Sequence, residues 1–143
     1  MATARSIWRS TVKLLHWTAF GALIATLVAG NSLPLRVAFS LAVGLWASGT
    51  LLFGLSGRPG PALTGALRRL FVPAHALLLA LLGLAAAALW SAEPDPLSGS
   101  VRTLFLVTLG AGLLHGIFHM WRHTVLNDGA LRNMTPRIIH DFL

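Results

Sequence analysis

Four stretches of this chain contain no Lys, Arg, Asp or Glu, and they restrict its fold more than any other feature. They cover residues 14–35, 37–57, 70–92 and 103–121. An α-helix needs about 20 apolar residues to cross a bilayer core of roughly 30 Å, and each stretch is about that long. None alternates polar and apolar residues as barrel strands do. The sequence therefore predicts an all-α integral membrane protein, a four-helix bundle in which residues 1–143 form a single domain. The expected helices lie near residues 11–29, 35–55, 70–90 and 100–126.

The charged residues between the stretches indicate which side of the membrane each loop faces. Most basic residues precede the first stretch, lie between the second and third, or follow the fourth. They are Arg5, Arg9, Lys13, Arg58, Arg68, Arg69, Arg122, Arg132 and Arg137. Arg36 and Arg102 fall on the other side, together with Glu93 and Asp95. The positive-inside rule then predicts that both the N and the C terminus are cytoplasmic. The net charge of +7 is interpreted as a topology signal and a surface for anionic membrane lipid, and nucleic acid is not expected as a partner.

The start of the chain and its lack of cysteine set two further limits. Basic residues followed by an apolar run are also typical of a signal peptide, but this run is long enough to span, so we expect an uncleaved helix. The chain has no Cys. This excludes disulfides, iron–sulfur clusters held by thiolates and covalently attached c-type haem. Any haem must therefore be held by side-chain ligation and packing alone.

Histidines stand out in these apolar stretches, because a polar residue inside a membrane is costly and usually marks a functional site. His16 lies near the start of the first stretch, beside Trp17, and His115 lies in the last. At 1.5 Å per residue both fall in the cytoplasmic half of the membrane, on different helices. Two such imidazoles could hold one haem iron between them. The alternative is that one or both histidines only pack or form hydrogen bonds.

Other histidines lie close to this pair along the chain. His119 and His123 follow His115 by four and eight residues, on one helix face, which indicates a proton relay or a quinone-binding strip. A spacing of four is also compatible with a zinc site, although no carboxylate or thiolate stands nearby in the sequence. His123 is equally typical of the headgroup region. His75 could bond a haem propionate or quinone, replace an expected ligand, or be interfacial. His140 falls in a polar, basic tail that we expect to be exposed.

Small residues are frequent in the predicted helices, as is typical of helices that pack closely in lipid. They are Gly21, Ala25, Ala42, Gly44, Ala47, Gly49, Gly83, Gly110, Gly112 and Gly116. The simplest interpretation of each is ordinary helix packing. A glycine beside a buried histidine would also leave space for a bulky planar ligand.

These residues together resemble the bacterial cytochrome b561 family, four-helix membrane proteins that carry b-type haem and exchange electrons with quinone. Lys13-Leu14-Leu15-His16-Trp17 resembles the ligand motif of the family's opening helix. His115, the pair Arg122-His123 and the segment from Asp128 to Pro136 resemble its fourth-helix ligand and its D-G-x-L-x-x-M-x-P tail. The resemblance covers most of the chain. It implies a multi-pass protein of the bacterial inner membrane, with His16 and His115 as axial ligands of the haem iron and with His75 and His119 close to the cofactor.

The chain departs from this family in one respect that affects its function. Family members commonly hold two haems, but the second predicted helix has no histidine, and Val101 stands where the outer ligand would be. The resemblance therefore implies one haem b, near the cytoplasmic side, in an electron-transfer protein. Its partner would be membrane quinone or a redox subunit such as a dehydrogenase, because related four-helix subunits anchor hydrogenases and formate dehydrogenases. The alternative is a haem-poor or haem-free accessory subunit packed against a larger respiratory or photosynthetic complex.

Overall fold

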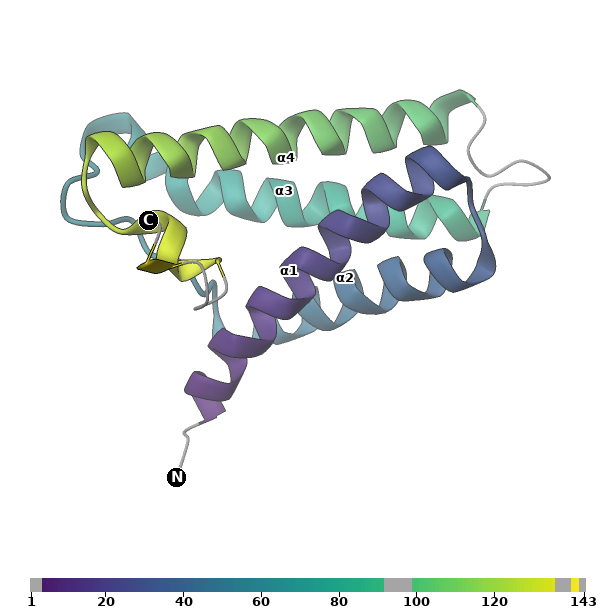
Figure 1. Ribbon diagram of the computed structural model, residues 1–143, viewed down its shortest axis with the longest axis horizontal. Helices are drawn as coiled ribbons and strands as arrows, with labels where there is room; N and C mark the ends of the chain where they lie inside the picture. The colour runs from purple at the N-terminus through teal and green to yellow at the C-terminus, as the bar shows by residue number, and fades with distance from the viewer. Residues whose placement is uncertain (1–3, 92–98, 136–139, 142–143) are drawn as a thin grey trace.

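The computed structural model describes residues 4–91, 99–135 and 140–141, and within these residues it is all-helical (Figure 1). Its elements are α1 (Ala4–Ala29), α2 (Leu33–Phe53), α3 (Gly65–Ser91), α4 (Gly99–Val125) and the short 3-10 helix η1 (Ala130–Asn133). All four α-helices are long and apolar enough to cross a membrane. The prediction of an all-α fold is confirmed for these residues, and the prediction of four spanning helices is confirmed as far as helix length and composition go. Four residues used in the sequence predictions lie outside the described residues. They are Glu93, Asp95, Pro136 and Arg137.

The helix ends follow from local chemistry and differ slightly from the predicted ends. In α2, Pro34 occupies the first turn, where its missing N–H costs nothing, and Gly54 ends the helix at a φ of 78°. Two helices begin earlier than expected. α1 starts at Ala4 rather than near Thr11, and α3 starts at Gly65 rather than near Leu70. Both extensions carry Arg side chains, which a search for charge-free stretches leaves out.

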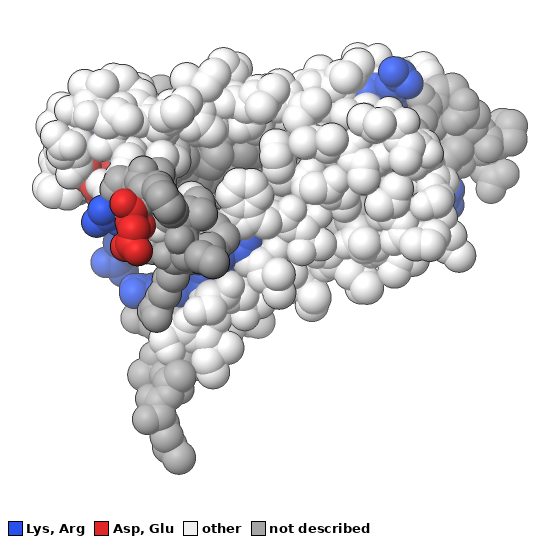
Figure 2. All heavy atoms as spheres, viewed as in Figure 1, with Lys and Arg blue, Asp and Glu red and all other residues white. Residues whose placement is uncertain are grey.

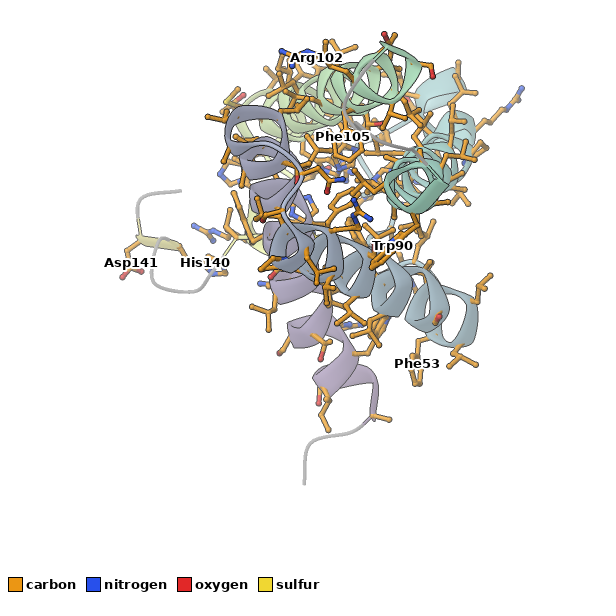
Figure 3. The ribbon with its side chains drawn as sticks, turned by 90° about the vertical axis from the view of Figure 1, so that its right-hand side faces the viewer. Phe53, Trp90, Arg102, Phe105, His140 and Asp141 are labelled. Carbon is orange, nitrogen blue, oxygen red and sulfur yellow. The ribbon has the colours of Figure 1, made fainter. Side chains whose placement is uncertain are left out.

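The helices pack in chain order, α1 on α2, α2 on α3 and α3 on α4, whereas α1 and α4 pack against each other less extensively than these three pairs. One part of the core lies toward the end of the bundle where α2 and α4 begin. There Phe39 and Phe105 are fully buried, with ring centroids 5.5 Å apart. Figure 3, which views the bundle from this end, shows Phe105 inside the ring of helices and Arg102 at its edge. Trp90 donates a hydrogen bond of 2.8 Å to Ser40 Oγ and ties α3 to α2 at the same end.

The glycines of the helices do not serve the close packing that we expected, with one exception. A Cβ on Gly49 would overlap the ring of Trp8, so α1 and α2 do approach closely there. A Cβ on any of six other helical glycines would meet no atom within 4 Å, so the packing prediction is wrong for these positions within the chain. They are Gly21, Gly44, Gly83, Gly110, Gly112 and Gly116.

Charged side chains lie mostly at one end of the bundle, the end that carries both chain termini (Figures 1 and 2). The long middle of the bundle shows almost no charge on the face drawn in Figure 2. The loop between α2 and α3 lies at this same end of the bundle (Figure 1).

Candidate functional site

A cavity of about 400 Å³ lies toward the basic end of the bundle and is lined by residues of all four α-helices and of the C-terminal segment. Its position follows from the packing, because α1 diverges from α4 toward its N-terminus, and these two helices pack against each other less extensively than the helices that follow one another in the chain (Figure 1). The lining is largely apolar, with Phe20, Leu79 and Leu109 among its residues. Gly112 and Gly116 of α4 also line it. Cofactor sites are typically mostly apolar pockets of roughly 300–1,000 Å³ with a few placed polar groups, and this cavity fits that description.

His16 is the polar group that α1 contributes to the cavity. Its ring meets the edges of two aromatic neighbours, Trp17 at 5.7 Å and Trp46 of α2 at 5.4 Å between centroids. These rings hold the imidazole in place. Its Nδ1 atom is buried and has no hydrogen-bond partner within the described part of the chain. A buried polar atom without a partner costs about 1–3 kcal/mol.

His115 contributes the corresponding imidazole from α4, and two more histidines surround it. Its ring centroid lies 4.7 Å from that of His75 and 4.4 Å from that of His119. All three rings line the same cavity as His16. The structure therefore brings all four predicted site histidines to one cavity. His123 does not line the cavity, and the strip predicted to run from His115 through His123 ends at His119.

Hydrogen bonds orient His75 within this group. Its Nδ1 atom lies 2.6 Å from the carbonyl oxygen of Phe71, one turn earlier in α3. A carbonyl can only accept, so Nδ1 carries the proton, and the lone pair of a neutral His75 ring is on Nε2. That Nε2 lies 3.2 Å from Nε2 of His119. His75 is thus fixed in the tautomer that offers its Nε2 lone pair to the histidine group.

The C-terminal segment closes one side of the cavity, and its backbone is bonded to α1. Lys13 Nζ donates to the carbonyl oxygens of Arg132 and Thr135, both at 3.0 Å. Trp17 Nε1 donates to the carbonyl oxygen of Met134 at 2.9 Å. Leu131, Met134 and Thr135 line the cavity. The expectation of an exposed tail is therefore wrong for this segment. It lies against the bundle because its carbonyl oxygens accept hydrogen bonds from α1.

An ion pair between Arg122 and Asp128 connects the same segment to α4. Both side chains are buried, and Arg122 Nε lies 2.7 Å from Asp128 Oδ2. Asp128 Oδ1 also accepts the N–H of Ala130 at 2.9 Å, and Gly129 adopts a left-handed φ of 68°. Together these contacts turn the chain back toward the cavity after α4. The aspartate and glycine of the D-G-x-L-x-x-M-x-P pattern thus act in positioning the segment that closes the site.

The sequence does not predict this closing segment. Lys13 and Arg122 count there only as basic residues of one membrane side, and Trp17 only as the neighbour of His16. His140 was expected to be exposed, yet its Nε2 lies 3.1 Å from the carbonyl oxygen of Thr135 and its side chain is partly buried. The useful signal was a turn pattern, Asp-Gly, directly after the last helix.

Comparison with family models, with curated proteins and with solved structures finds no match for this chain. Functional inference therefore starts from the cavity and its histidines.

Proposed function

We propose that this protein is a membrane b-type cytochrome that carries one haem and exchanges single electrons with membrane quinone or with a partner redox subunit. The observation that carries the proposal is that His16 of α1 and His115 of α4 line one largely apolar cavity. Two histidines from different helices are the ligand set that a six-coordinate haem needs, and no cysteine is available to bind one covalently.

The residues present fit such a group in three respects. The cavity has the volume and the apolar lining of a cofactor site. Gly112 and Gly116 flank His115 along the cavity wall, and the space beside them is open where a larger side chain would stand. His16 has a buried ring nitrogen that lacks a partner within the described residues. His16 and His115 would hold the iron, and the C-terminal segment would exclude water from the side of the cavity that it covers. Bound haem would supply a one-electron couple whose potential depends on axial ligands and burial.

The test is a reduced-minus-oxidised spectrum of the purified chain, with pyridine haemochrome quantitation of haem per polypeptide. We expect one haem per chain and a low-spin spectrum. His16→Ala and His115→Ala should each remove that spectrum, whereas His123→Ala, which changes a histidine outside the cavity, should retain it. Absence of haem from the wild-type chain produced with ample haem supply would refute the proposal, and two haems per chain would refute the ligand assignment.

Quinone is the proposed electron partner within the membrane. Ser56 lines the cavity beside Gly57, and its buried hydroxyl has no partner among the described residues. A hydroxyl and the imidazole of His119 are groups that could hydrogen-bond a quinone oxygen. Reduction of the haem by a quinol analogue should therefore slow in His119→Ala while the haem content stays unchanged. An unchanged rate would place the quinone elsewhere.

The accessory-subunit function has one observation in its favour. Four of the open glycines, Gly21, Gly44, Gly83 and Gly110, do not line the cavity, and each leaves room on the helix surface for an approaching backbone. Small residues on exposed helix faces are typical of contacts between membrane helices. This function predicts a colourless chain that co-purifies with a larger redox complex. A coloured chain within such a complex would satisfy both functions.

A further inference from the structure

Three imidazoles gather on one side of the cavity in an arrangement that a single haem does not require. His75 of α3 and His115 and His119 of α4 each offer one ring nitrogen, and these nitrogens all lie within 4.8 Å of one another. We propose that the haem-free chain binds one divalent transition-metal ion of the zinc class through His75, His115 and His119, and that this ion and haem exclude each other.

The spacing of two of the three nitrogens already matches a metal site. Zinc binds histidine nitrogen at 2.0–2.1 Å with tetrahedral geometry, so two ligand nitrogens lie about 3.3 Å apart. The Nε2 atoms of His75 and His119 are 3.2 Å apart. The third nitrogen lies within 4.8 Å of the others, so it has to approach by no more than about 1.5 Å to reach that tetrahedral separation. Rotation of the His115 side chain into the open cavity beside Gly116 could provide this movement.

The hydrogen bond from His75 prepares this ring for a metal. Metal-binding histidines usually donate their second ring N–H to a carbonyl or carboxylate, which fixes the tautomer and the ring plane. His75 Nδ1 already makes such a bond to the Phe71 carbonyl, at 2.6 Å. Its Nε2 therefore carries a lone pair, and that lone pair faces His119. A metal ion would replace one hydrogen bond between the two rings with a bond to each of them.

The type of donor selects the type of ion. The chain has no cysteine, and Asp128, the acidic side chain nearest in sequence to α4, is held by Arg122. The site therefore offers three neutral imidazoles, which suit Zn²⁺, Cu²⁺ and Co²⁺ better than Mg²⁺ or Ca²⁺. Three protein ligands leave a fourth tetrahedral position for water or hydroxide, as in catalytic zinc sites. A hydroxide there would lower the net charge that the ion brings into an apolar region.

His115 makes the binding of the metal ion and the binding of haem mutually exclusive. It belongs to the metal cluster and also to the proposed axial pair with His16, and one imidazole cannot ligate both ions through the same nitrogen. A chain that holds the divalent ion would therefore be closed to haem until the ion leaves. The cavity would have two alternative occupants, each recruiting a different partner for His115.

The test measures binding of Co²⁺ and Zn²⁺ to the full chain in detergent. The chain is first prepared without haem, stripped of metal with a chelator and freed of any affinity tag. Tetrahedral Co²⁺ gives intense visible bands, and Zn²⁺ competition with elemental analysis gives the stoichiometry. We expect one ion per chain. Loss of a hydrogen-bond partner of a metal ligand costs 10–100-fold in affinity, so loss of a ligand, in His75→Ala or His119→Ala, should cost at least about 100-fold.

The variants separate this proposal from the haem proposal. His16→Ala should lose haem and keep the metal, His75→Ala should lose the metal, and His115→Ala should lose both. His123→Ala is the matched control and should keep both, and circular dichroism checks that each variant remains helical. The metal site is overturned if the wild-type chain binds no ion, or if His75→Ala and His119→Ala bind as tightly as the wild type. The mutual exclusion, which rests on the proposed function, is overturned if a wild-type chain that takes up haem does so equally well with saturating Zn²⁺.

Discussion

The buried ion pair of Arg122 and Asp128 gives the sharpest test of how the cavity is closed. Both side chains are at most 3% exposed. The guanidinium also lies over two rings, at 5.1 Å from the centroid of Phe71 and 5.8 Å from that of Phe118. The pair is the main polar link between the end of α4 and the segment that covers the cavity. If it is removed, the part of the segment next to α4 should loosen, while Lys13 and Trp17 still bond its backbone to α1.

The contacts of the pair determine how much free energy of unfolding each variant should lose. Asp128→Asn keeps an oxygen for the N–H of Ala130 but leaves Arg122 buried without a counter-charge, and breaking a buried pair in this way costs about 3–5 kcal/mol. Asp128→Ala also removes the hydrogen bond to Ala130, which adds about 1 kcal/mol. Arg122→Met leaves the carboxylate buried alone and should cost as much as Asp128→Asn. The double variant, Arg122→Met with Asp128→Asn, leaves no uncompensated charge, so it should be no less stable than either single variant.

The free energy of unfolding of the four variants can be measured by denaturant titration in mixed micelles, followed by circular dichroism. Susceptibility of the C-terminal segment to protease reports its release in the same samples. Additive costs in the double variant would refute the reasoning, because they would mean that the two side chains do not interact. A cost below about 1 kcal/mol for Asp128→Asn would also refute it, since such a value is typical of an exposed pair.

Three further predictions test other parts of the structure. Gly49→Ala should destabilise the chain by about 1–3 kcal/mol in the same titration, since its Cβ would overlap the ring of Trp8, and a neutral effect would contradict the close contact of α1 with α2. Gly112→Leu should fill the cavity and abolish haem binding while the chain stays folded. Gly110→Leu, which changes an open position outside the cavity, should bind haem normally. Equal haem content in the two variants would count against the site. Trp17→Phe should remove one hydrogen bond to the C-terminal segment, about 0.5–1.5 kcal/mol, and speed amide exchange there, and unchanged exchange would show that the bond does not hold the segment.

The sequence predicts the helices of this protein better than it predicts the site. A span is a local property, because about 20 residues without charge suffice to indicate it, and all four were found. The grouping of His75 with His115 and His119 depends on how α3 is rotated against α4, which no local pattern records. The glycines illustrate the same limit. A small residue indicates that something can approach the helix closely, but it does not indicate whether that is another helix or a ligand. At Gly112 the neighbouring space belongs to the cavity and not to another helix.

The C-terminal segment was missed for a different physical reason. Its sequence is polar, and polar segments are expected in water, but its backbone carbonyls are the groups that bind Lys13 and Trp17. Amino-acid composition describes side chains, and it does not indicate which main-chain carbonyl oxygens accept hydrogen bonds. The structure gives this segment a role that its composition does not indicate, since the segment bridges α1 and α4.

The weak contact between α1 and α4 connects these observations. Three sides of the bundle are held by extensive helix packing, and on the fourth the direct contact of α1 with α4 is limited and the C-terminal segment and the cavity lie beside it. A group bound there would provide contacts that the chain itself lacks, so occupation should stabilise the fold by about 2.7 kcal/mol when the ligand is present at 100 times its dissociation constant. Haem ligated by His16 and His115 would link α1 to α4, whereas an ion held by His75, His115 and His119 would link only α3 to α4. Haem should therefore protect α1 from amide exchange, and a metal ion should not.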